Sequence, residues 1–106
     1  MEKLRFSDPL PNLVLEGSKN TTWRMDDEKN IEVGDLLSFC RVNGEEFAKA
    51  ELFGVKETTF GQLTEEDKSG HEPFSSDREM YETCSGYYEK KVTPKTKLKV
   101  IKFRLI

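Results

Sequence analysis

Residues 36–60 read LLSFCRVNGEEFAKAELFGVKETTF, and this stretch carries the strongest structural signal in the chain. Residues 36–42 have the apolar side chains of a buried strand, and Asn43-Gly44 is typical of a tight hairpin turn. We therefore expect residues 46–60 to return antiparallel to the first strand, with Gly54 marking a bulge or a bend. This hairpin is predicted to form the centre of a β-sheet.

Further strands are predicted on both sides of the hairpin. A short one covers residues 3–6, another runs through residues 21–24, and the last covers residues 97–105. In the last strand the apolar alternation changes phase between Val100 and Ile101. Either a bulge lies there or both faces of the strand are covered.

Two short helices are expected among these strands. Ser7 or Asp8 is predicted to cap the first helix, and Gly17 to end it. A capping-box pattern that begins at Ser76 predicts the second helix, which should end near Cys84. Together these elements predict a mostly β (α+β) fold, in which a small, strongly curved antiparallel sheet or barrel carries short helices.

The totals limit the classes of protein that remain. At 106 residues and 12.3 kDa we expect one domain over residues 1–106. No apolar run approaches the roughly 18 to 20 residues that cross a bilayer, so we expect a cytoplasmic protein without membrane contact. Cys40 and Cys84 are isolated and should be buried free thiols. With a single histidine in the chain they offer no metal-ligand set, so neither a metal nor another cofactor is expected.

The basic residues are unevenly placed in a chain of formal net charge -3. The last stretch contains no acid after Glu89, and its basic residues are Lys90, Lys91, Lys95, Lys97, Lys99, Lys102 and Arg104. Such a strand could follow a phosphate backbone. Alternatively, these side chains protect an edge strand or solvate one face, and both interpretations stay open.

Residues 17–24, GSKNTTWR, concentrate the side chains best suited to a binding site. Alternation along a strand places Thr22 and Arg24 on one face and Trp23 on the other, where it would join the core. A guanidinium beside hydroxyls and an aromatic ring commonly holds a planar, hydrogen-bonding ligand. By itself, Lys19 after a glycine is more often a solvated turn residue.

The pattern Gly17-x-Lys19-x-x-Thr22-x-Arg24, with a helix before it, a Val33-Gly34-Asp35 turn leading to a strand and a closing β-strand, resembles the ASCH domain, a family of PUA-like β-barrels. The resemblance covers nearly the whole chain. It implies a PUA-like antiparallel β-barrel with two or three short helices. It also implies a small pocket suited to RNA or a modified nucleoside.

Some small bacterial members of that family are amidohydrolases that remove the acetyl group from N4-acetylcytidine, using a lysine, a threonine and a glutamate. Lys19 and Thr22 match the first two positions, and Glu72 matches the third with a one-residue gap. The resemblance implies Thr22 as the nucleophile, Lys19 as the base and Glu72 as a proton carrier or orienting group. Arg24 and His71 are assigned to substrate binding, although a histidine in a polar loop is ordinarily exposed and without a role.

Three functions remain open on the sequence: a nucleoside amidohydrolase, an RNA-binding module without catalysis, and an adaptor that docks another protein. Catalysis requires the pKa of Lys19 to fall towards about 7 to 8, whereas contact with an ionised Glu72 would raise it. Catalysis also requires Lys19 to lie in the turn or on a bulge before the strand, because a regular strand would place Lys19 and Thr22 on opposite faces. The oligomeric state is not indicated.

Overall fold

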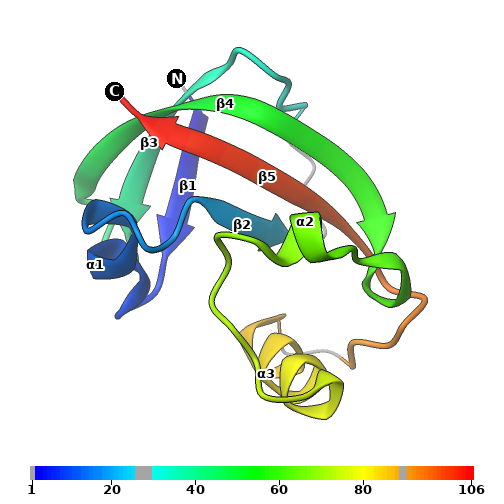
Figure 1. Cartoon of the computed structure of the whole chain (residues 1–106). Helices are drawn as coiled ribbons and strands as arrows, with labels where there is room; N and C mark the ends of the chain where they lie inside the picture. Colours follow the sequence, from blue (N-terminus) through cyan, green and yellow to red (C-terminus); the bar gives the residue numbers. More distant parts are fainter. Residues whose placement is uncertain (1, 26–29, 89–90) are drawn as a thin grey trace.

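The protein is built on one curled five-stranded sheet, seen in the computed structural model as a half-barrel (Figure 1). The structure describes residues 2–25, 30–88 and 91–106. Its strands are β1 (Glu2–Phe6), β2 (Thr21–Arg24), β3 (Leu36–Arg41), β4 (Glu46–Thr59) and β5 (Lys97–Leu105). They lie in the order β1-β3-β4-β5-β2, so β1 and β2 form the two edges of the sheet.

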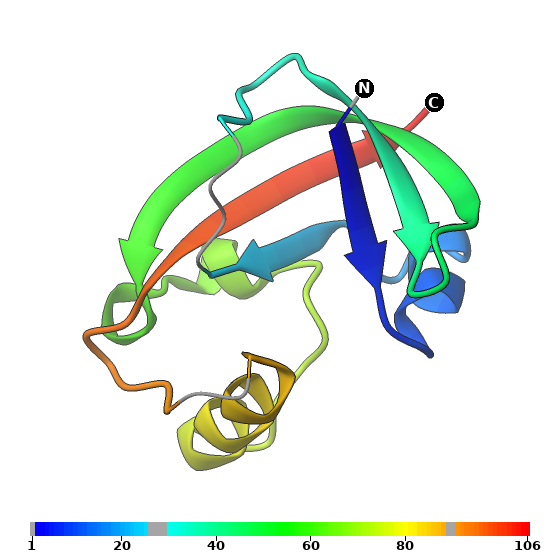
Figure 2. The same cartoon turned by 180° about the vertical axis from the view of Figure 1, so that it is seen from behind.

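The resemblance implied two or three short helices, and the described residues form three: α1 (Leu10–Leu15), α2 (Glu65–Lys68) and α3 (Asp77–Tyr88). A single 3-10 turn, η1 (Phe60–Gln62), follows β4. Helix α3 lies below the open side of the sheet in both views (Figures 1 and 2). None of the helices in the described residues is long and apolar enough to span a membrane.

The predicted hairpin is present and explains how the sheet curves. Strands β3 and β4 pair antiparallel, and Gly44 in the turn has a φ of +91°, a conformation that favours glycine. In the pairing of β4 with β5 the register shifts between Leu52 and Gly54, which confirms the predicted bulge. A bulge bends its strand, so the 14-residue β4 can pair with β3 near its start and with β5 over most of its length.

Strand β5 fills two separate hydrophobic clusters from its two faces. Ile101 and Phe103 belong to the barrel cluster inside the curled sheet, whose buried residues are Leu4, Phe6, Val14, Ile31, Leu37, Phe39, Ala50, Leu52, Ile101 and Phe103. Leu98 and Val100 belong to the α3 cluster, whose buried residues are Trp23, Met25, Phe60, Met80, Cys84, Val92, Leu98 and Val100. Of the two predicted explanations for the phase change in β5, coverage of both faces is therefore correct.

Strand β1 pairs parallel to β3, whereas the other three ladders are antiparallel, because the chain crosses over through α1 and β2 between β1 and β3. Two local predictions need correction. The N-cap of α1 is Pro9 rather than Ser7 or Asp8, and no side chain caps the helix. Helix α3 continues to Tyr88 instead of ending near Cys84, because a glycine inside a helix costs only about 1 kcal/mol relative to alanine and does not have to end it.

Candidate functional site

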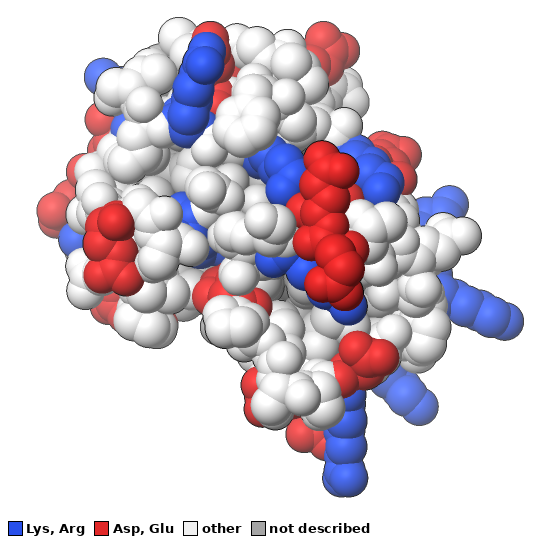
Figure 3. Space-filling model, in the orientation of Figure 1, with Lys and Arg blue, Asp and Glu red and all other residues white. Residues whose placement is uncertain are grey.

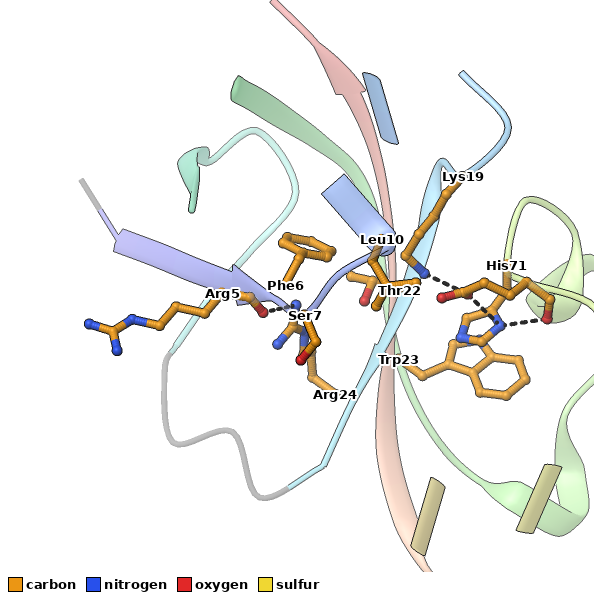
Figure 4. Close-up of a pocket in the computed structure, with 10 residues that line it drawn as sticks. Arg5, Phe6, Ser7, Leu10, Lys19, Thr22, Trp23, Arg24 and His71 are labelled. Carbon is orange, nitrogen blue, oxygen red and sulfur yellow. Dashed lines mark hydrogen bonds and ion pairs between the residues drawn. The ribbon is translucent and has the colours of Figure 1, made fainter. Parts of the chain in front are cut away.

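A pocket of about 160 Å³ lies where the two edge strands approach each other (Figure 4). All five residues that the sequence singled out border it, together with residues from β1 and α1. Its lining is Arg5, Phe6, Ser7, Leu10, Lys19, Thr22, Trp23, Arg24, His71 and Glu72. The open seam of the half-barrel is thus the place where the predicted site assembles.

Lys19 reaches this pocket from the segment between α1 and β2. The positive φ of Gly17, +88°, ends the helix, and the backbone N–H of Lys19 then donates to the carbonyl of Leu13 at 3.1 Å. The side chain is 3% exposed, and its Nζ donates to the carbonyl of Thr21 and to Oε2 of Glu72, both at 2.8 Å. Lys19 therefore lies before the strand, as the catalytic hypothesis requires.

The Lys19–Glu72 contact is a partly buried ion pair. Burial lowers the pKa of Lys19 below 10.5, the nearby Arg24 adds to this, and Glu72 opposes it. Burial alone would raise the pKa of Glu72, but the charges of Lys19 and His71 and the hydrogen bond from Lys19 outweigh it, so that pKa is lowered. The pair combines an amine that gives up its proton more easily than usual with a carboxylate that stays ionised.

His71 packs against an aromatic ring with only 10% of its side chain exposed, so the expectation of an exposed imidazole was wrong. Its ring stacks on Trp23 with centroids 3.8 Å apart and planes 15° apart, which shields it from water. Nδ1 lies 3.0 Å from Oε2 of Glu72. Burial, and then the charge of Lys19, lower the pKa of His71 to about 4. At neutral pH the imidazole is uncharged, and its Nδ1–H can donate to Glu72.

Thr22 and Arg24 reach the pocket from β2. Thr22 is buried and pairs with Ile101 of β5. Arg24 crosses to the other edge strand, where its Nη2 donates to the carbonyl of Arg5 at 2.9 Å and its guanidinium lies 4.7 Å from the ring centroid of Phe6 (Figure 4). Arg24 therefore joins the two edges of the sheet and forms one wall of the pocket.

No family model matches the sequence, and no curated protein matches it. Solved structures do resemble it. The hypothetical protein PH0355 superposes with a TM-score of 0.76 over 100% of both chains at 20% identity. An ASCH domain from Lactobacillus crispatus gives 0.70 over 90% of this chain and 69% of its own, at 17% identity. A mutant of ZmASCH from Zymomonas mobilis gives 0.67 over 96% of this chain and 66% of its own, at 13% identity.

The chain has the fold of an ASCH domain. At these identities the likeness concerns the fold, and it agrees with the predicted PUA-like barrel.

Sequence reasoning missed several parts of the pocket in this ASCH fold. The wall that Phe6 and Leu10 contribute gives no sequence signal, because only the strand order brings β1 opposite β2. The contact between Gly70 and the start of β2 was also missed. The carbonyl of Gly70 accepts from the backbone N–H groups of Asn20 and Thr21, at 2.9 and 3.1 Å. A glycine in a polar loop was the one available hint of a close backbone approach.

A second, larger pocket of about 370 Å³ shares part of its lining with the first one. Trp23, His71 and Glu72 border both pockets, and the second one adds Phe74 and the start of α3. Ligand sites usually measure about 300 to 1,000 Å³, so the first pocket alone is small for a nucleoside. The second pocket falls within this range.

In the described parts of the chain, neither the two cysteines nor a cluster of potential metal ligands adds a reactive group to the site. Cys40 and Cys84 are buried and free, as predicted. Burial, with a contribution from Glu72, raises the pKa of Cys84 to about 11, so its thiol stays protonated. Within the described ranges, no three His, Cys, Asp or Glu side chains gather as metal ligands would.

Proposed function

We propose that this ASCH-fold protein binds a modified cytidine and hydrolyses its N4-acetyl amide. The site is the pocket of about 160 Å³ between β1 and β2, which we call the seam pocket. One observation carries the proposal: the buried amine of Lys19, 2.8 Å from the carboxylate of Glu72, borders the same pocket as the buried hydroxyl of Thr22. Amide hydrolysis through a hydroxyl needs a nearby base and a group that can return a proton to the leaving amine. This arrangement supplies both.

In the first step the neutral amine of Lys19 takes the proton of the Thr22 hydroxyl as its oxygen attacks the acetyl carbonyl. The resulting tetrahedral intermediate collapses with cleavage of the bond between the carbonyl carbon and N4. The ammonium of Lys19 returns the proton to N4, and cytidine leaves. The acetyl group remains as an ester on Thr22.

In the second step water attacks this ester. Lys19 or Glu72 takes a proton from the water, and acetate leaves as the oxygen of Thr22 regains its proton. Glu72 also holds Lys19 in place, and His71 in turn contacts Glu72. Arg24 provides a guanidinium at the pocket wall, next to the position that a planar base would take.

The test is an activity assay in which the purified protein is incubated with N4-acetylcytidine at several pH values between 6 and 9. Chromatography measures the cytidine that is released. Thr22→Val removes the hydroxyl at nearly constant shape and should lower kcat by at least about 10³-fold. The matched control is Thr22→Ser, which keeps a hydroxyl and should retain measurable turnover. Lys19→Met should lower kcat by about 10² to 10⁴-fold. A folded wild type without turnover over this range would refute the substrate assignment.

One observation favours a second function, the binding of RNA without catalysis. The Lys19–Glu72 contact is an ion pair with a distance of 2.8 Å, and a permanent ion pair would favour the protonated lysine. The basic residues of β5 give this alternative little support, because Arg104 pairs with Glu51 and Lys102 binds carbonyl oxygens within the chain. Acidic and basic side chains are also interspersed on the face in Figure 3. RNA binding that weakens steeply with salt and survives Thr22→Val would identify this function.

A further inference from the structure

The loop that carries His71 and Glu72 is held by its carbonyl oxygens rather than by a strand ladder. Four carbonyls accept these hydrogen bonds: those of Glu66 and Asp67 within α2, and those of Ser69 and Gly70 after it. Besides the backbone N–H of Ser69, which donates to the carbonyl of Glu66 within the segment, the donors belong to β2, to the residue before it, or to β5. They are Trp23 Nε1, Thr21 Oγ1, Lys102 Nζ and the backbone N–H groups of Asn20 and Thr21. The loop is thus fixed to the same strands that present the rest of the pocket.

Lys102 is the side chain that joins most of these contacts. Its Nζ lies 2.8 Å from the carbonyl oxygen of Glu66, 3.4 Å from that of Ser69 and 3.3 Å from Oγ1 of Thr21. An ammonium has three protons to donate, and its charge suits the carbonyl end of a helical turn. Thr21 completes the network, since its hydroxyl donates to the carbonyl of Ser69 at 2.7 Å.

The path from this network to the pocket is short and stiff. Gly70 follows Ser69 with a φ of +81°, and a Cβ added there would lie 1.7 Å from Oδ1 of Asn20. The next two residues are His71, which stacks on Trp23, and Glu72, which pairs with Lys19. A loop with so little freedom transmits the position of its anchor to the carboxylate of Glu72.

We propose that Lys102 is a positioning residue of the seam pocket: by binding the carbonyls of Glu66 and Ser69 it holds the loop so that Glu72 meets Lys19 and His71 meets Trp23. Its effect on turnover rests on the proposed amidohydrolase function. Its effect on the loop does not, and the two are measured separately.

The loop is tested through the only histidine in the chain, which gives a single resolved imidazole titration by NMR. In the wild type the pKa of His71 should be about 4. Lys102→Met keeps the aliphatic stem and removes the donors, so the loop should loosen and the pKa of His71 should rise towards its ordinary value of 6.5. Lys97→Met removes an equal charge from an exposed position on the same strand and should leave the titration unchanged.

The rate of N4-acetylcytidine turnover tests whether Lys102 affects catalysis. Lys102→Met should lower kcat about 10 to 100-fold with a smaller change in KM, because a misplaced catalytic group mainly affects the transition state. Lys102→Arg keeps a cationic donor and should recover part of the loss. If the wild type shows no turnover, the proposed function fails, while the His71 titration still decides the role of Lys102.

A second variant covers the case in which Lys102→Met does not fold. Thr21→Val removes the hydroxyl that bonds to Ser69 and Lys102, at nearly constant volume, and should raise the pKa of His71 by a smaller amount. The proposal is overturned if folded Lys102→Met and Thr21→Val both match Lys97→Met in the His71 titration. It is also overturned if Lys102→Met of an active enzyme keeps the kcat of Lys97→Met.

Discussion

The barrel cluster and the α3 cluster lie on opposite faces of β5, and they hold their parts of the molecule differently. Around the barrel cluster, four strand ladders surround packed rings such as Phe6, Phe39 and Phe103. On the α3 side, the connection from α2 is tied to the sheet by side-chain and carbonyl contacts. The pocket draws Lys19 and Thr22 from the first region and His71 and Glu72 from the second. A change in the first region should therefore affect the whole fold, and a change in the second should affect the site.

The largest effect is expected in the barrel cluster. Phe39 is fully buried, and its ring lies 4.8 Å from that of Phe6 and 4.7 Å from that of Phe103. Phe39→Ala should lower the free energy of unfolding by about 3 to 5 kcal/mol, which urea denaturation would measure. Met80→Ala is the comparison in the α3 cluster and should mainly increase hydrogen exchange in α3. Equal loss of protection throughout the sheet in both variants would contradict the division into two regions.

A smaller effect is expected where the loop meets the sheet. Gly70→Ala requires a positive φ and forces the new Cβ against Asn20, so it should lower the free energy of unfolding by about 1 to 3 kcal/mol. It should also raise the pKa of His71, because the loop can no longer pack closely. Gly86→Ala is the matched control. That position lies inside α3 with open space around it, and the substitution should stabilise the fold by about 0.5 to 1 kcal/mol. A neutral Gly70→Ala would show that the close approach is not needed.

The last effect concerns pH. The pKa of His71 is about 4 in the folded protein and near 6.5 when unfolded, so the unfolded chain binds a proton first as the pH falls. The free energy of unfolding should therefore decrease from pH 6.5 towards pH 4, by no more than about 1.4 kcal/mol per pH unit from this residue. The charged groups facing the ring are Lys19 and Glu72. The lowered pKa of Glu72 places its own loss of stabilisation below about pH 4.5, at the acid end of this range.

His71→Phe isolates this contribution, because it keeps an aromatic ring against Trp23 and removes the titrating group. Denaturation of both proteins at several pH values should show a flatter profile for the variant between pH 6.5 and 5. Parallel profiles would assign the acid sensitivity to other groups.

The fold was predictable where a short stretch of sequence decides its own conformation. The Asn43-Gly44 turn, the bulge at Gly54 and the extent of the last strand all follow from local signals, and the structure has them. The parallel pairing of β1 was not predictable in this way. It depends on a crossover, and no residue within β1 encodes its partner.

The residues that border the pocket could be named in part from the sequence, but the contacts among them could not. The resemblance to the ASCH domain pointed to Lys19 and Thr22, and both border the pocket. The burial of His71 was missed because a polar loop gives no sign that an aromatic surface on a distant strand will cover it. The connection of Arg24 to Arg5 was missed for the same reason, since it joins strands that are neighbours only across the seam.

The pairing of β2 with β5 has one more consequence. Thr21 and Lys102 face each other although 81 residues separate them, which is the longest separation among the four ladders of the sheet. The entropy of closing a loop grows with its length, so this ladder is the one least favoured by chain proximity. The hairpin of β3 and β4 can form from neighbouring residues alone, but the strand that bears Thr22 gains its partner only when β5 is in place. The pocket therefore forms only when the sheet is complete, after β2 and β5 have paired.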